Sequence, residues 1–193
     1  MGIGQALTIP ARRRHDRRAS WASAAAPSIA AALILTTRPD APTLSSLVAG
    51  VGLAALATAD AVSHRLPAKH VRAFAGLTAA SLIGASWWHD EWSPLLRAVE
   101  GASVVALLLG ALWLALPGAI AFGDLKVTVV AFAAAAAVSW RAGAVMIVLA
   151  CVIGGCIAVI ARVTRRHLTS AQPTIPFVPG LALGFVVGVM VPW

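Results

Sequence analysis

The sequence predicts an all-α protein, a polytopic membrane helix bundle with about seven transmembrane helices. Hydrophobic residues make up 60% of the 193-residue chain and charged residues 11%, whereas about 25% of an average soluble domain is charged. The mean hydropathy is +0.86. A soluble domain of this length cannot hide so much apolar surface, because surface-to-volume scaling limits its core. The apolar residues also fall into separate runs with basic clusters between them, which is typical of a membrane protein.

Seven apolar segments follow one another along the chain. We expect them at about 21–37, 44–62, 73–88, 96–116, 125–140, 142–161 and 177–191. A bilayer core of about 30 Å needs roughly 20 helical residues, so several of these segments are short. We therefore expect a basic cytoplasmic tail over residues 1–20 and a single transmembrane domain over residues 21–193.

Polar or helix-breaking stretches separate the segments. They comprise a proline turn at 38–42, a basic loop at 64–72, an acidic loop at 89–94, Pro117-Gly118, Arg141 and a basic loop at 162–167. Trp87 and Trp88 precede the acidic loop and suit the membrane interface. The first segment is alternatively the apolar region of a signal peptide, which would leave six helices. We favour a retained helix, because no convincing cleavage site precedes the next polar loop.

The distribution of basic residues predicts the orientation. With the N-terminus in the cytoplasm and seven alternating segments, twelve of the fifteen lysines and arginines fall on the cytoplasmic side. This asymmetry is the expected positive-inside pattern. It predicts a multi-pass protein of the inner (plasma) membrane, with the C-terminus outside.

The net charge of +8 raises nucleic acid as a partner, but the basic residues form no face interleaved with aromatics, so we expect none. Cys151 and Cys156 lie five residues apart in one apolar run, with no Cys-x-x-Cys pair and no Cys/His cluster. A metal site is therefore not expected, and no cofactor is predicted.

Two carboxylates stand apart from the other acidic residues. Asp60 and Asp124 both fall at helix ends on the predicted cytoplasmic face, where a carboxylate within the membrane region marks a functional site. If the two approach within hydrogen-bond range, they cannot both stay ionised and they share a proton. Such a dyad can activate water for peptide hydrolysis. The alternative is that each carboxylate is solvated at the interface or paired with Arg65 or Lys126.

The sequences around the two carboxylates resemble known motifs. Residues 60–67 read DAVSHRLP, residues 121–126 read AFGDLK, and residues 175–184 read IPFVPGLALG. In this order they resemble the motifs of the prepilin peptidases, membrane aspartic peptidases of the GxGD type. The resemblance implies that Asp60 and Asp124 are catalytic and that Arg65, Pro67, Gly123 and Lys126 support the active site or the substrate.

The resemblance further implies an endopeptidase that removes the leader of type IV or Flp-like prepilins on the cytoplasmic side. Its partners would be a pilin-like precursor and the lipid bilayer. Larger members of the family carry a cytoplasmic Cys-x-x-Cys segment associated with methylation. This chain has none, so it resembles the short, peptidase-only members of tight-adherence pilus systems.

Two departures keep other functions open. Ala121 stands where the family has the first glycine of Gly-x-Gly-Asp, and Ala68 stands where it has an asparagine after the proline. A catalytically degenerate relative that scaffolds pilus assembly is therefore one alternative. A small ion-coupled transporter is another, although intramembrane carboxylates with that role are usually near the midplane, often with paired repeats or broken helices.

Overall fold

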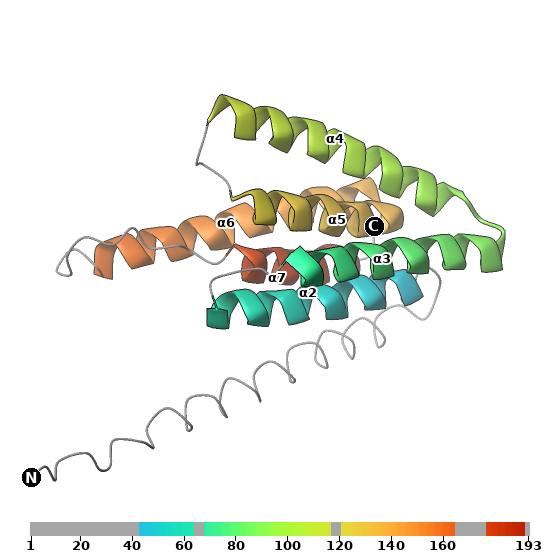
Figure 1. Cartoon of the computed structure of the whole chain (residues 1–193), viewed down its shortest axis with the longest axis horizontal. Helices are drawn as coiled ribbons and strands as arrows, with labels where there is room; N and C mark the ends of the chain where they lie inside the picture. The colour runs from blue at the N-terminus through green and yellow to red at the C-terminus, as the bar shows by residue number, and fades with distance from the viewer. Residues whose placement is uncertain (1–42, 64–67, 117–120, 165–176, 192–193) are drawn as a thin grey trace, which may run out of the picture.

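The computed structural model describes residues 43–63, 68–116, 121–164 and 177–191, and these residues are all helical or in short connections. The six helices are α2 (Thr43–Ser63), α3 (Ala68–His89), α4 (Ser93–Ala115), α5 (Phe122–Val138), α6 (Trp140–Thr164) and α7 (Val178–Met190). Consecutive helices run in opposite directions along the long axis (Figure 1). The all-α prediction is therefore confirmed for the described part of the chain. The tail 1–20 and the first apolar segment, 21–37, lie outside it.

The helix boundaries differ from the predicted ones by one to five residues. Helix α3 begins at Ala68, so Lys69, His70 and Arg72 belong to its exposed first turns and not to a loop, as predicted. Helix α5 ends at Val138 and α6 begins at Trp140, with Ser139 between them in an extended conformation. The break lies at Ser139 and not near Arg141 because its hydroxyl accepts a hydrogen bond from the Ala142 N–H and so caps α6.

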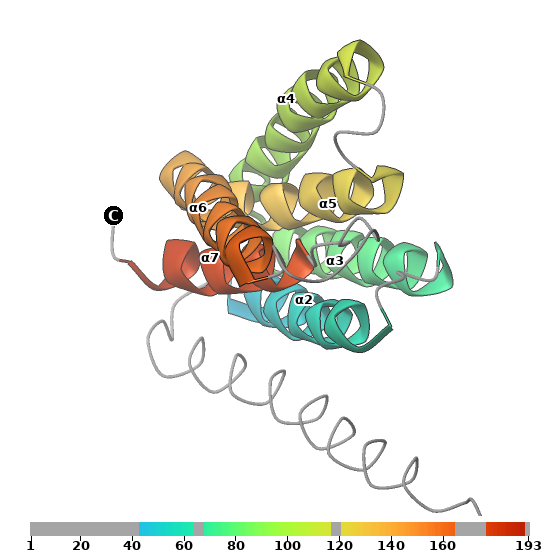
Figure 2. The ribbon, with the colours of Figure 1, turned by 90° about the vertical axis from the view of Figure 1, so that its left-hand side faces the viewer.

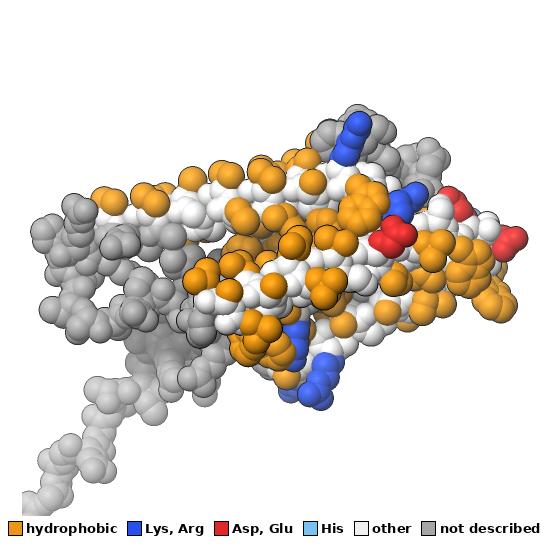
Figure 3. Space-filling model, turned by 90° about the horizontal axis from the view of Figure 1, so that it is seen from above, with side chains coloured by type: hydrophobic (Ala, Val, Ile, Leu, Met, Phe, Trp, Pro, Cys, Tyr) orange, Lys and Arg blue, Asp and Glu red, His pale blue; other side chains and the backbone are white. Residues whose placement is uncertain are grey.

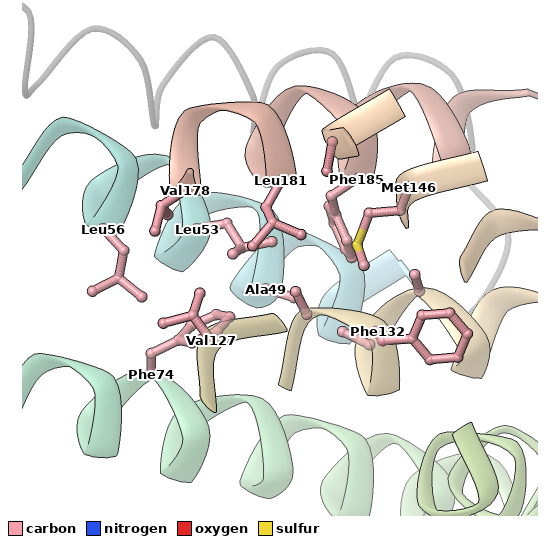
Figure 4. Packing of buried hydrophobic residues seen from close by; sticks show 14 of the residues in the cluster. Ala49, Leu53, Leu56, Phe74, Val127, Phe132, Met146, Val178, Leu181 and Phe185 are labelled. Atoms are coloured by element: carbon pink, nitrogen blue, oxygen red, sulfur yellow. The ribbon is translucent and has the colours of Figure 1, made fainter. Parts of the chain in front are cut away.

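Helix α5 lies at the centre of the bundle and contacts each of the other five helices (Figure 2). Its alanines at 131 and 134–137 are buried, and such small side chains let neighbouring helices approach closely. Phe132 is its largest buried side chain and lies against Gly101 of α4 and Gly143 of α6. The apolar core continues between α2, α3, α6 and α7 through Leu53, Phe74, Met146, Leu181 and Phe185 (Figure 4).

Helices α6 and α7 are held in close contact by glycines spaced four residues apart. A Cβ atom built on Gly184 would lie 2.5 Å from the Met146 carbonyl oxygen, and one on Gly188 would lie 2.5 Å from that of Ala142. The backbones therefore touch where no side chain separates them. This packing accounts for part of the 175–184 motif, because Gly180 and Gly184 face α6.

Among the described helices, two have the length and composition to cross a membrane: α4, and residues Trp140–Ile157 of α6. Helix α7 and residues Ser45–Asp60 of α2 are apolar but shorter. Hydrophobic side chains cover much of the side seen in Figure 3, and the acidic side chains on it lie toward the end with the α3–α4 turn. This is weak support for a membrane protein; the number of spans and their orientation stay predictions.

Candidate active site

The helix directions bring Asp60 and Asp124 to the same end of the bundle, which we call the carboxylate end. Asp60 lies in the last turn of α2 and Asp124 in the first turn of α5, and these two helices pack against each other. Asp60 is 7% exposed, whereas Asp124 is half-buried. Residues 64 positions apart in sequence thus share one site.

The two carboxyl groups interact electrostatically. Asp124 precedes the apolar stretch of α5 that begins at Val127. The two groups act on each other as charges across this end of the bundle, and we call Asp60 and Asp124 the coupled pair.

The start of α5 is built without a side-chain cap. Ala121 is its N-cap residue with φ −70° and ψ 137°, an extended conformation that any L-residue adopts. Its carbonyl accepts a hydrogen bond from the Leu125 N–H at 3.2 Å. Alanine at the position of the first glycine of the prepilin peptidase motif therefore causes no backbone strain.

Thr128 makes a hydrogen bond to the first turn of α5. The residue is 5% exposed, and its hydroxyl donates a 2.7 Å hydrogen bond to the Asp124 carbonyl oxygen one turn earlier. This contact fixes the backbone that carries Asp124. The sequence motif did not include Thr128, although a hydroxyl residue four positions after a candidate catalytic residue is a recognisable signal.

Gly123 borders open space among the described residues, since no atom of theirs lies within 4 Å of a Cβ built there. The absence of a side chain thus serves no close helix contact in this part of the chain.

Lys126 points its ammonium group at the Phe122 ring, with Nζ 4.2 Å from the ring centroid. Phe122 also contacts Trp113 of α4, with the ring centroids 5.6 Å apart. Within the described helices Lys126 makes no ion pair with Asp124, so the structure offers no sign that it holds this carboxyl ionised. Its exposed position fits a residue at a membrane boundary.

The remaining residues of the predicted site are placed only in part. Arg65 and Pro67 lie outside the described residues. Ala68 is the first residue of α3 and is exposed. An asparagine here would therefore stand at the start of a helix, where its side chain could accept a hydrogen bond from a free N–H group.

No cluster of three or more histidines, cysteines or carboxylates able to hold a metal ion occurs in the described part of the chain. Cys151 and Cys156 are exposed free thiols on α6. The chemistry available at the carboxylate end is therefore that of two coupled carboxyl groups beside a glycine and an exposed aromatic pair.

Comparison with known proteins adds no assignment: no protein-family model, curated protein or solved structure matches the chain significantly. The resemblance to the prepilin peptidases therefore depends on the three motifs and on the site geometry that accompanies them.

Proposed function

We propose that the chain is a membrane-embedded aspartic endopeptidase that cleaves the leader peptide from type IV or Flp-like prepilins. The observation that carries the proposal is the coupled pair of Asp60 and Asp124 at one end of the bundle. Each member of the pair stands in a motif that resembles the corresponding prepilin peptidase motif. The open space beside Gly123 is a second support, because a scissile peptide must approach Asp124 closely.

The two carboxyl groups supply the elements that peptide hydrolysis needs. The ionised member takes a proton from a water molecule, whose oxygen attacks the scissile carbonyl carbon. The protonated member donates its proton to the carbonyl oxygen, giving a tetrahedral gem-diol. The gem-diol collapses as one of its hydroxyl groups loses a proton and the amide nitrogen gains one. The C–N bond breaks, and the pair returns to its single shared proton.

The proposal includes a topology. The six described helices and the apolar segment 21–37 cross the inner membrane seven times, with the N-terminus in the cytoplasm and the C-terminus outside. The positive-inside distribution of lysine and arginine supports this orientation. It puts the carboxylate end on the cytoplasmic side, where the leader of a precursor is located.

The test is co-expression with a candidate precursor that has a basic leader, a glycine at the cleavage position and an apolar helix. Asp60→Asn and Asp124→Asn should each abolish leader removal, followed by gel mobility and by mass spectrometry of the product N-terminus. Asp90→Asn is the matched control. Asp90 lies in the α3–α4 turn with φ 51°, which asparagine also tolerates. Unchanged processing by either dyad variant would refute the dyad.

A non-catalytic scaffold in pilus assembly is the second candidate, and the alanines at 121 and 68 are its support. It predicts that the purified wild-type protein cleaves no precursor, while the Asp60→Asn and Asp124→Asn variants still support pilus formation. The unstrained conformation of Ala121 weighs against it. The carboxylates also lie in terminal helix turns, which does not favour a transporter.

A further inference from the structure

The exposed charged side chains separate by sign between the two ends of the bundle. At the carboxylate end, Lys69 and Arg72 are exposed in the first turns of α3. Lys126 is exposed near the start of α5 at the same end. We call these three side chains the basic rim.

The opposite end of the bundle mainly exposes acidic side chains. The α3–α4 turn and the first turns of α4 expose three carboxylates, those of Asp90, Glu91 and Glu100. Arg97 at this end is half-buried and donates a hydrogen bond to the Ala137 carbonyl oxygen, whereas Arg141 is exposed. The basic rim thus distinguishes the carboxylate end from the other end.

The members of the basic rim lie at a similar level along the bundle. Helices α3 and α5 both begin at the carboxylate end and pack against each other. Phe74 of α3 and Val127 of α5 belong to one core cluster and lie side by side (Figure 4). Arg72 and Lys126 shortly precede these two residues in the chain, so both reach the same level on the outside of the bundle.

The two carboxylates of this end do not neutralise the basic rim. Asp60 continues the buried side of α2 that carries Leu53 and Leu56, and it is 7% exposed. Asp124 lies one turn before the buried Thr128 on α5. The negative groups are therefore drawn into the bundle while the positive groups face outward. Within the described helices, no member of the basic rim makes an ion pair.

Helix stability does not explain why basic residues stand here. The first turn of a helix is the positive end of its dipole and disfavours a cation. Helix α3 has no acidic residue in its first turn that would offset Lys69. The positive charge of the rim is therefore left for an anion outside the described helices to neutralise.

An aromatic pair lies at the level of the basic rim. The Lys126 Nζ lies 4.2 Å from the centroid of the Phe122 ring, and Phe122 contacts Trp113. Both rings are partly exposed. Tryptophan is enriched where the bilayer core meets the headgroups, and a lysine at that level extends its ammonium group into the headgroup layer.

We propose that the basic rim binds the phosphate groups of anionic phospholipids around the carboxylate end. This inference rests on the proposed membrane topology and not on peptidase activity. A lipid headgroup fits because it combines the required negative charge with the level at which Trp113 and Lys126 lie. Since Lys126 follows Asp124 by two residues, the same contact holds the first turn of α5 at the membrane boundary.

Photocrosslinking in vesicles tests the proposal. The photoreactive residue p-benzoyl-phenylalanine replaces His70, which is exposed between Lys69 and Arg72. The matched control replaces His89, which is exposed at the opposite end of the same helix. The vesicles contain equal parts of phosphatidylglycerol and phosphatidylcholine, and mass spectrometry identifies the attached lipid. From position 70 we expect an excess of phosphatidylglycerol adducts of about fivefold or more, and from position 89 no excess.

Charge-removing variants test the residues. Lys69→Gln combined with Arg72→Gln should bring the ratio of the two lipids at position 70 close to one. Arg141→Gln, which removes an exposed cation from the opposite end, should leave that ratio unchanged. With the photoreactive residue in place of Phe122, Lys126→Gln should lower the excess of phosphatidylglycerol about fivefold.

The outcomes separate this inference from the proposed function. If alkaline carbonate removes the wild-type protein from the vesicles, the topology and the lipid inference both fail. If the protein stays integral but position 70 yields both lipids equally, or the double glutamine variant keeps the excess, the lipid inference alone is overturned. Binding of a poly-glutamate peptide without any preference for phosphatidylglycerol would also overturn it and would favour an acidic protein partner. Precursor cleavage enters none of these measurements, so the peptidase proposal stands or falls separately.

Discussion

The contact between α6 and α7 leads to a prediction with a definite size. A Cβ atom on Gly184 would lie 2.5 Å from the Met146 carbonyl oxygen and 3.2 Å from its Cα. Ordinary carbon–oxygen contacts are about 3.3–3.6 Å, so Gly184→Ala forces the two backbones apart by roughly 1 Å. The atom in the way belongs to the main chain, so no side-chain rotation can relieve the contact.

The expected loss of stability follows from two opposing effects. Overpacking typically costs about 1–3 kcal/mol, while replacing glycine by alanine in a helix contributes about 1 kcal/mol of stability. We expect Gly184→Ala to lower the free energy of unfolding by up to about 2 kcal/mol. The Gly188→Ala substitution should cost less stability in the Gly184→Ala variant than in the wild-type protein, because one displacement of α7 relieves both contacts.

The assay is reversible unfolding in mixed detergent micelles, followed by the fluorescence of the seven tryptophans. The matched control is Gly76→Ala in α3, where no atom of the described residues lies within 4 Å of the new Cβ. That variant should be as stable as wild type or more stable by up to about 1 kcal/mol. Equal stability of Gly184→Ala and Gly76→Ala would refute the close approach of α6 and α7.

Two further perturbations follow from the core. Arg97→Met removes the 2.9 Å hydrogen bond from Nη2 to the Ala137 carbonyl oxygen in the last turn of α5 and should cost about 1.5–3 kcal/mol. Arg97→Lys, which retains a charged donor, should recover part of that loss, and equal losses in both variants would speak against the bond. Phe132→Ala should cost about 3–5 kcal/mol, measured by the same unfolding, and a loss below about 1 kcal/mol would mean that the site collapses around the missing ring.

Most of the secondary structure was predictable, because apolar runs bounded by proline, glycine and charged residues are local signals. The predicted segments 44–62, 96–116 and 177–191 differ from α2, α4 and α7 by no more than three residues at either end. The predicted start of this helix at about residue 73 was wrong, because Lys69, His70 and Arg72 lie in the first turns of α3, which are exposed. The exposed side of those turns offers no hydrophobic signal, so periodicity does not reveal it.

The site was predictable in its residues but not in its surroundings. Asp60 and Asp124 could be assigned to one face from charge counting and motifs. Neither the contact of Lys126 with Phe122 nor the hydrogen bond of Thr128 with the Asp124 carbonyl follows from a spacing of four residues alone, since side-chain rotamers decide both. Gly123 was ambiguous in the sequence between a helix contact and a substrate contact, and only the tertiary structure shows that none of the described helices contacts it closely.

By itself the sequence determined the helical class, the apolar character and the positions of two carboxylates relative to the basic clusters, because each of these depends on composition and on local order along the chain. The tertiary structure decided that the two carboxylates interact electrostatically, that α5 is the central helix, and that α4 separates from the bundle near Asp124. Those features depend on how closely helices approach one another. Contacts such as that of Gly184 with Met146 and that of Gly101 with Phe132 set this approach, and they join residues that lie far apart in the chain.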